Sequence, residues 1–393
     1  MVVLKFLLPL FFLIFSFTEI LKLRVYASVS VGVLDLVLAL IALIWIMKIK
    51  KNEYFLKKPF LIFVGIAIFS LIINFTKFSS QEILVSFLYF ARWVLYASLY
   101  FIMVDIGKQL VSKISIYMFF SGFLILIFGF FQIVFYPSLK NLYYLGYDEH
   151  MHRLFATFLD PNFAGTFLVL LFVFIFLLRD KLFGNKKFLS YLVLGFNFIA
   201  IVLTYSRGAI LMLIVCVVIY SALTRKWKLT AGIICLFAVI FFVLSPIFSV
   251  ENTNLLRFAS VEARIDSSKK ALEIFQKNPM GVGFNTYRFA REKYERTDWS
   301  GAGPSHAGAG VDNSFILILV TTGVFGLISY IYLLYKMFML GFLKIKQNPY
   351  ALILIVSLGG LIVNSLFLNS LFYSFIMIWI WVLAGLTESN LRE

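Results

Sequence analysis

Cysteine is nearly absent from this chain, and so is sequence repetition. Cys216 and Cys235 are the only thiols among 393 residues, and both lie within apolar runs. Neither a disulfide framework nor a zinc site is therefore expected to organise the fold. The sequence also has no internal repeat of fixed period and no low-complexity tail. Many transporters are built from repeats, so this absence argues against that class of membrane protein.

Apolar residues, in contrast, dominate the composition. They make up 62% of the chain, which has 47 phenylalanines and a mean hydropathy of +0.96. Runs of about 20 residues, long enough for a helix to cross a hydrocarbon core, recur from end to end. These runs lack the alternation of a membrane β-strand. The composition therefore predicts an all-α polytopic membrane protein. In such a protein the net charge of +16 is expected to come from Lys and Arg residues in cytoplasmic loops, and it does not indicate nucleic-acid binding.

About twelve transmembrane helices are expected. The apolar runs cover residues 4–17, 29–47, 59–75, 82–104, 113–136, 154–178, 188–204, 207–224, 229–248, 312–335, 349–367 and 370–386. No small-residue cleavage site follows the first run, so we expect it to be a retained helix and not a signal peptide.

The basic residues are distributed unevenly between alternate loops. With the N-terminus in the cytoplasm, 17 Lys and Arg residues fall in short inner loops and 6 in short outer loops. Lys and Arg accumulate in cytoplasmic loops, so this orientation is favoured over its inverse. Both termini are therefore expected to face the cytoplasm.

One loop is much longer than the others and divides the chain. Residues 249–311 form an expected periplasmic loop between transmembrane helices 1–9 (residues 1–248) and helices 10–12 (residues 312–393). An apolar stripe predicts an amphipathic helix over 261–277, capped by Ser260 and ended by Asn278-Pro279. Such a helix is expected to lie along the membrane or over a cavity. A glycine-rich stretch follows at 301–310.

Arg207 is the clearest candidate for ligand binding. It lies in a short outer turn, within Thr-Tyr-Ser-Arg-Gly-Ala, where a helix starts. One interpretation is an interfacial arginine whose head group reaches the membrane surface. The other is a diphosphate ligand, because a guanidinium offers forked donors to phosphate and the amides at a helix start add to its field.

Arg153 opens a second outer segment, in which Asp160-Pro161-Asn162 lies about two turns into the apolar run 154–178. Two interpretations are open. Pro161 either interrupts a helix at membrane depth and lines a cavity, or it is the first residue of a helix that begins there.

Three further residues are candidates in or beside the long loop. Arg264 lies on the amphipathic helix, on the face opposite most of its lysines, and His306 lies in the glycine-rich stretch. Asp312 begins the next helix, where aspartate is also a usual cap. Taken singly, each has an ordinary explanation as a solvated charge, an exposed loop histidine or a helix cap.

Several motifs follow one another in a distinctive order between residues 150 and 330. They are R-x-x-x-T-F-x-x-P-N-x-x-G from Arg153, T-x-S-R-G-A around Arg207, Arg264 itself, N-P-M-G-V-G-F-N-T-Y at 278–287, and D-N-S-F-I-L-I-L-V-T-T-G-V-F-G-L-I at 312–328. As a set they resemble the O-antigen ligase and O-antigen polymerase superfamily. The resemblance implies about twelve helices in a GT-C-like arrangement, with a large periplasmic loop before the last group of helices.

The resemblance also implies an activity and a location. Members of this family move a glycan from undecaprenyl diphosphate to an acceptor hydroxyl on the outer face of the bacterial inner membrane. The acceptor is lipid A core in ligases and another carrier-linked glycan in polymerases. The residues suit a metal-independent, inverting transfer without a cofactor, since the outer loop lacks an Asp-x-Asp motif and arginines supply the counter-charge. A lipid-linked oligosaccharide flippase is the alternative of another class.

Roles for the candidate residues follow from this resemblance and from their chemistry. Arg207 and Arg264 are expected on the diphosphate, with Arg153 as a second-rank member of the cluster. Many members have histidine where this chain has Asp312, and His306 lies six residues earlier. Either residue is therefore a candidate for the base that takes the acceptor's proton.

Overall fold

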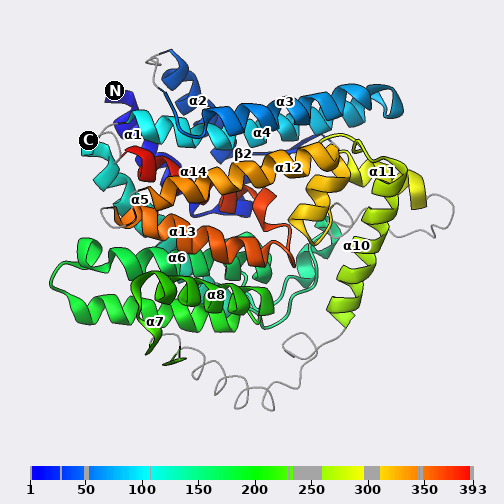
Figure 1. Ribbon diagram of the computed structural model, residues 1–393. Helices are drawn as coiled ribbons and strands as arrows, with labels where there is room; N and C mark the ends of the chain where they lie inside the picture. The colour runs from blue at the N-terminus through cyan, green and yellow to red at the C-terminus, as the bar shows by residue number, and fades with distance from the viewer. Residues whose placement is uncertain are drawn as a thin grey trace.

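The computed structural model describes residues 2–26, 29–47, 53–106, 108–228, 231–232, 259–295, 310–343, 345 and 348–389, which form a bundle of apolar helices (Figure 1). Among the described residues, five helices are long and apolar enough to cross a membrane: α4 (Ser80–Asp105), α5 (Lys108–Phe135), α6 (Pro161–Phe183), α8 (Arg207–Thr224) and α12 (Ser314–Phe342). The shorter ones are α1 (Val2–Phe15), α2 (Val33–Ile46), α3 (Lys57–Ile73), α7 (Lys187–Leu203), α13 (Pro349–Asn364) and α14 (Ser374–Ser389). The chain is a multi-pass membrane protein.

Each predicted transmembrane run that falls on described residues corresponds to one of these helices. The run 229–248 lies outside the described residues except for 231–232, so the count of twelve stays a prediction. The largest difference in a helix start is at the run 154–178, whose helix starts only at Pro161. A proline is favoured in the first turn because its missing N–H has no helical partner there in any case.

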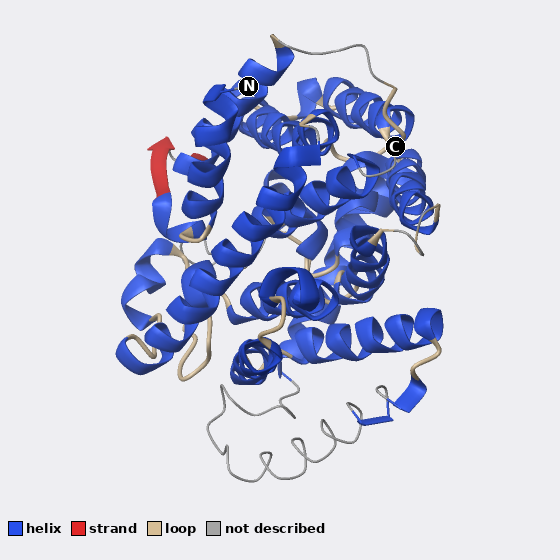
Figure 2. Ribbon diagram, turned by 90° about the vertical axis from the view of Figure 1, so that its left-hand side faces the viewer, coloured by secondary structure: helices blue, strands red, loops and turns tan. Residues whose placement is uncertain are grey.

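A two-stranded hairpin is the departure from the all-helical prediction. Strands β1 (Lys22–Tyr26) and β2 (Val29–Gly32) pair antiparallel at the edge of the bundle (Figure 2). The segment is rich in valine at alternate positions, which favours extended backbone. Helix α2 therefore begins at Val33, four residues later than predicted, where the Asp35 carboxylate accepts the Gly32 amide (2.9 Å).

The helices are packed around α14, most of which is buried. Helix α14 packs on α4 and α13, while α13 packs on α8 and α12 on α3. The start of α1 and the end of α14 lie at one end of the bundle, together with the turn between α6 and α7 (Figure 1). Helices α10 (Ala259–Lys277) and α11 (Tyr287–Glu295) lie at the opposite end.

Helix α10 confirms the amphipathic helix predicted in the long loop. It ends directly before Asn278-Pro279, as predicted, but it includes Ser260, so the prediction of a Ser260 cap is wrong. Ala271 and Ile274 on its inner face are buried in a small core of their own, with Val282 and Val320. Helix α11 was not predicted. Its nine residues are polar on average and too few to form a stable helix alone, and Tyr287 and Ala290 pack into the same small core as Ala271 and Ile274.

The loop that follows α10 is hydrogen-bonded into a break in α12. Gly323 has φ +72° and ψ −173°, so the helix is interrupted there. The Val282 and Gly283 amides donate to the carbonyls of Val320 and Thr321, both at 2.9 Å. Non-helical backbone within a span needs such internal partners. The contact fixes the end of α10 against α12, and with it the side chains that α10 presents to the bundle.

Gly323→Ala is expected to lower the free energy of unfolding by about 2 kcal/mol or more, since this backbone conformation is nearly restricted to glycine. A Cβ there would also lie 2.7 Å from the Met280 carbonyl carbon. The midpoint of thermal unfolding of the purified protein, at a fixed scan rate, measures the effect. Gly195→Ala is the control, because a Cβ on Gly195 in α7 would meet no atom within 4 Å. Equal midpoints for the two variants would contradict this account of the break.

Candidate functional site

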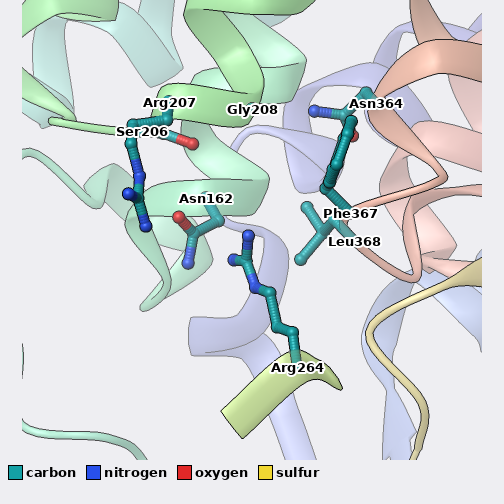
Figure 3. Close-up of a pocket in the computed structure, with 8 residues that line it drawn as sticks. All are labelled: Asn162, Ser206, Arg207, Gly208, Arg264, Asn364, Phe367 and Leu368. Atoms are coloured by element: carbon teal, nitrogen blue, oxygen red, sulfur yellow. The ribbon is translucent and has the colours of Figure 1, made fainter. Parts of the chain in front are cut away.

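A small, open pocket lies where α10 faces the starts of α6 and α8 and the end of α13 (Figure 3). Its walls are polar on the side of α6, α8 and α10, and partly apolar beyond the end of α13. The lining residues are Asn162, Ser206, Arg207, Gly208, Arg264, Asn364, Phe367 and Leu368. Segments up to about 200 residues apart in the sequence thus meet at one site.

Arg207 is placed at the pocket by the turn that starts α8. Ser206 is the cap of this helix, and its hydroxyl accepts the Ala209 amide (3.4 Å). The turn packs closely on α6, because a Cβ on Gly165 would lie 2.8 Å from the Ala209 Cβ and 2.9 Å from the Thr204 hydroxyl. The start of α8, which carries Arg207, is therefore fixed against α6, and a helix start favours an anion.

Arg153 lies beneath this turn and is almost completely buried, with 1% of its surface exposed. Its guanidinium donates to the carbonyls of Thr204 (2.9 Å) and Tyr205 (3.5 Å), and to the amide oxygen of Asn162 (3.4 Å). It does not line the pocket. Arg153 therefore holds the Arg207 turn against the start of α6.

The start of α6 settles the two interpretations of Asp160-Pro161-Asn162. Pro161 is the first residue of the helix, and the Asp160 carboxylate accepts the amides of Asn162 (2.6 Å) and Phe163 (3.2 Å). The proline therefore does not break a helix. It directs Asn162 toward the pocket, so the second interpretation of this segment is confirmed.

Arg264 reaches the same pocket from α10, and Asp312 lies beside it. The Arg264 Nε is 3.8 Å from the Asp312 carboxylate. Helix α12 is capped by Asn313, whose side chain accepts the amides of Phe315 and Ile316, so the cap explanation for Asp312 is wrong. Burial raises the pKa of Asp312, the Arg264 guanidinium acts to lower it, and the Asp160 carboxylate adds to the rise.

His306 lies outside the described residues, so its position relative to the pocket stays a prediction. Among the residues that are described, no group of three or more His, Cys, Asp or Glu side chains is arranged to hold a metal ion. The polar atoms that face the pocket are mainly nitrogen donors on guanidinium and amide groups.

Three lining residues at and just after the end of α13 were not identified from the sequence. Asn364 ends α13, and Phe367 and Leu368 follow it. Asparagine is common near the ends of helices, so nothing in the sequence distinguished Asn364 from a residue that only ends a helix. Its place at the site depends on the packing of α13 against α8.

Comparison with protein families gives a match to part of the chain. Residues 190–331 match the O-antigen ligase family model, over a segment that runs from α7 into α12. The match includes Arg207, Arg264 and Asp312, and it excludes Arg153 and Asn364. No curated protein matches the chain. The match covers 142 of the 393 residues, and it supports the resemblance to the O-antigen ligase and polymerase superfamily that the motifs indicate.

Proposed function

We propose that this chain transfers a glycan from undecaprenyl diphosphate to an acceptor hydroxyl, on lipid A core or another surface glycan. The family supports a membrane glycosyltransferase at the coarse level. One observation supports the specific donor most strongly: Arg207 and Arg264, from helices far apart in the sequence, line one pocket beside the start of α8. A lipid-linked glycan diphosphate carries one negative charge on each phosphate, and two guanidinium groups match that charge.

The proposed reaction is a single displacement. The acceptor oxygen forms a bond to the anomeric carbon while the bond from that carbon to the diphosphate oxygen breaks. The acceptor proton goes to a base, and undecaprenyl diphosphate leaves with both bonding electrons. The anomeric centre is inverted. Arginines fixed in advance around the leaving group stabilise the charge that develops on it.

Two residues are proposed for the base, and they differ in their surroundings. Asp312 forms an ion pair with Arg264, so its carboxylate also serves to orient that guanidinium. Burial raises the pKa of Asp312, but the Arg264 guanidinium acts against that rise, whereas an imidazole ordinarily titrates near neutral pH. The proposal therefore assigns the base to His306 and an orienting role to Asp312, with the reverse assignment as the alternative. Arg153 takes a positioning role beneath Arg207.

The proposed topology has twelve transmembrane helices, both termini in the cytoplasm of the bacterial cell and the pocket on the periplasmic side of the inner membrane. It keeps the division into helices at 1–248, a periplasmic loop at 249–311 and helices at 312–393. The charge bias of the loops supports this orientation. So does the arrangement of the bundle, because α10 lies at the end opposite the start of α1 and the end of α14 (Figure 1).

Single cysteines test this orientation in a background without Cys216 and Cys235. A cysteine at Lys269, exposed on α10, is expected to react with a membrane-impermeant thiol reagent in intact cells. One at Asn185, exposed in the turn between α6 and α7, is expected to react only after the cells are broken. The opposite labelling pattern would invert the topology and remove the pocket from the periplasm.

Glycan transfer by the purified protein tests the function. With a defined undecaprenyl-diphosphate glycan as donor, transfer is expected to persist in excess EDTA, because arginines supply the counter-charge for the leaving group. Activity that disappears in EDTA and returns with magnesium or manganese would refute the arginine-only mechanism. Supplying lipid A core and carrier-linked glycan as separate acceptors distinguishes a ligase from a polymerase in the same assay.

A further inference from the structure

Two asparagine amides line the pocket together with the two arginines (Figure 3). Asn162 lies in the first turn of α6 and Asn364 is the last residue of α13. Neither carries a charge, and neither belongs to the segment that matches the family model. In Figure 3 the Asn162 amide nitrogen lies between the Arg207 and Arg264 guanidinium groups.

The orientation of the Asn162 amide is determined by Arg153. A guanidinium has only donors, so the Asn162 atom that faces it, at 3.4 Å, must be the amide oxygen. The amide nitrogen then faces the pocket. Turning the amide over would place its NH2 group against the buried guanidinium, so that two donors face each other and their hydrogen bond is lost. Arg153 is therefore a positioning residue for Asn162 as well as for the Arg207 turn.

Asn364 is almost completely buried, with 1% of its surface exposed, and it also directs its nitrogen to the start of α8. The Thr166 hydroxyl shares its proton between the Asn162 carbonyl (2.8 Å) and the Asn364 amide oxygen (3.2 Å). Among the described residues, no acceptor is recorded for the Asn364 amide nitrogen. A Cβ on residue 208 would lie 3.2 Å from that nitrogen, so Gly208 leaves it room beside the helix start.

We infer that Asn162 and Asn364 are donor ligands of the lipid diphosphate, arranged with Arg207 and Arg264 around the two phosphate groups. This inference rests on the proposed function. The two arginines balance the charge of the bound donor, and the neutral amides add hydrogen bonds without adding charge. When the glycosidic bond breaks, the leaving oxygen gains a negative charge, and an amide fixed between the guanidinium groups is placed to donate to it.

Asn162→Asp and Asn364→Asp test the inference with almost no change of shape. In Asn162→Asp one carboxylate oxygen still accepts from Arg153, so the fold is retained while an oxygen replaces the pocket-facing NH2 group. The measurement is the Kd of the purified protein for farnesyl diphosphate, a short-chain analogue of the leaving group. Each variant is expected to raise this Kd by about 10–100-fold, because a donor is lost and a like charge is introduced. Asn185→Asp, which makes the same change on the exposed turn between α6 and α7, is expected to leave the Kd unchanged.

The outcomes separate this inference from the proposed function. Wild-type affinity in both aspartate variants, combined with weak binding in Arg207→Lys, would overturn the asparagine ligands and leave the diphosphate site intact. Failure of the wild-type protein to bind farnesyl diphosphate would overturn both. Thermal unfolding midpoints of the variants verify that any loss of binding is not a loss of fold. The two asparagines lie on different helices, so each variant tests the inference independently.

Discussion

Arg207→Lys is expected to reduce glycan transfer by about a hundredfold, although the substitution keeps the positive charge. Lysine has a single ammonium group in place of the planar fork that binds two phosphate oxygens at once. A charge-assisted contact that strengthens in the transition state contributes on the order of 3 kcal/mol, which corresponds to this loss of rate. Arg264→Ala is expected to cause a similar loss from the opposite wall of the pocket. Initial rates of transfer with the purified variants measure both effects.

Matched controls lie on the same two helices. Arg225→Lys makes the same change at the far end of α8, and Lys269→Ala removes an exposed charge from α10. Both are expected to transfer glycan at close to the wild-type rate. Normal transfer in Arg207→Lys and Arg264→Ala, with protein levels confirmed, would mean that the diphosphate does not bind in this pocket.

His306→Ala is expected to slow transfer by about 10²–10⁴-fold, which is the usual contribution of a general base. Asp312→Asn is expected to keep much more of the activity, because Asp312 forms only an ion pair with Arg264, at 3.8 Å, and takes no proton in this assignment. The two variants are compared in one assay at the same pH. A severe defect in Asp312→Asn with near-normal transfer in His306→Ala would reverse the assignment and make the aspartate beside Arg264 the base.

The sequence was informative wherever one local signal determines the structure. Apolar runs of membrane length located the helices, and the stripe at 261–277 located α10. The start of α6 required a choice that periodicity alone does not make, because an apolar run continues on both sides of Pro161. Only the Asp160 cap, which accepts two amides, places the helix start there.

Features that depend on contacts between distant segments were not predictable. The interruption of α12 at Gly323 exists because the loop after α10 supplies amides to its carbonyls, a pairing that no local pattern encodes. Asn364 is a site residue only because α13 packs against α8. Arg153 was expected at the diphosphate on its charge and position, and the structure instead surrounds it with backbone carbonyls of the Arg207 turn. Charge alone did not distinguish an arginine that lines a pocket from one that supports it.

The most direct test of the central claim is the stoichiometry of the reaction in proteoliposomes that contain the purified protein, a labelled undecaprenyl-diphosphate glycan and an acceptor. The account predicts one undecaprenyl diphosphate released for each glycan joined to the acceptor, with both products lost together in Arg207→Lys. If the labelled donor instead crosses the bilayer with its glycan still attached, and no undecaprenyl diphosphate is released, the chain is a transporter and the account is wrong.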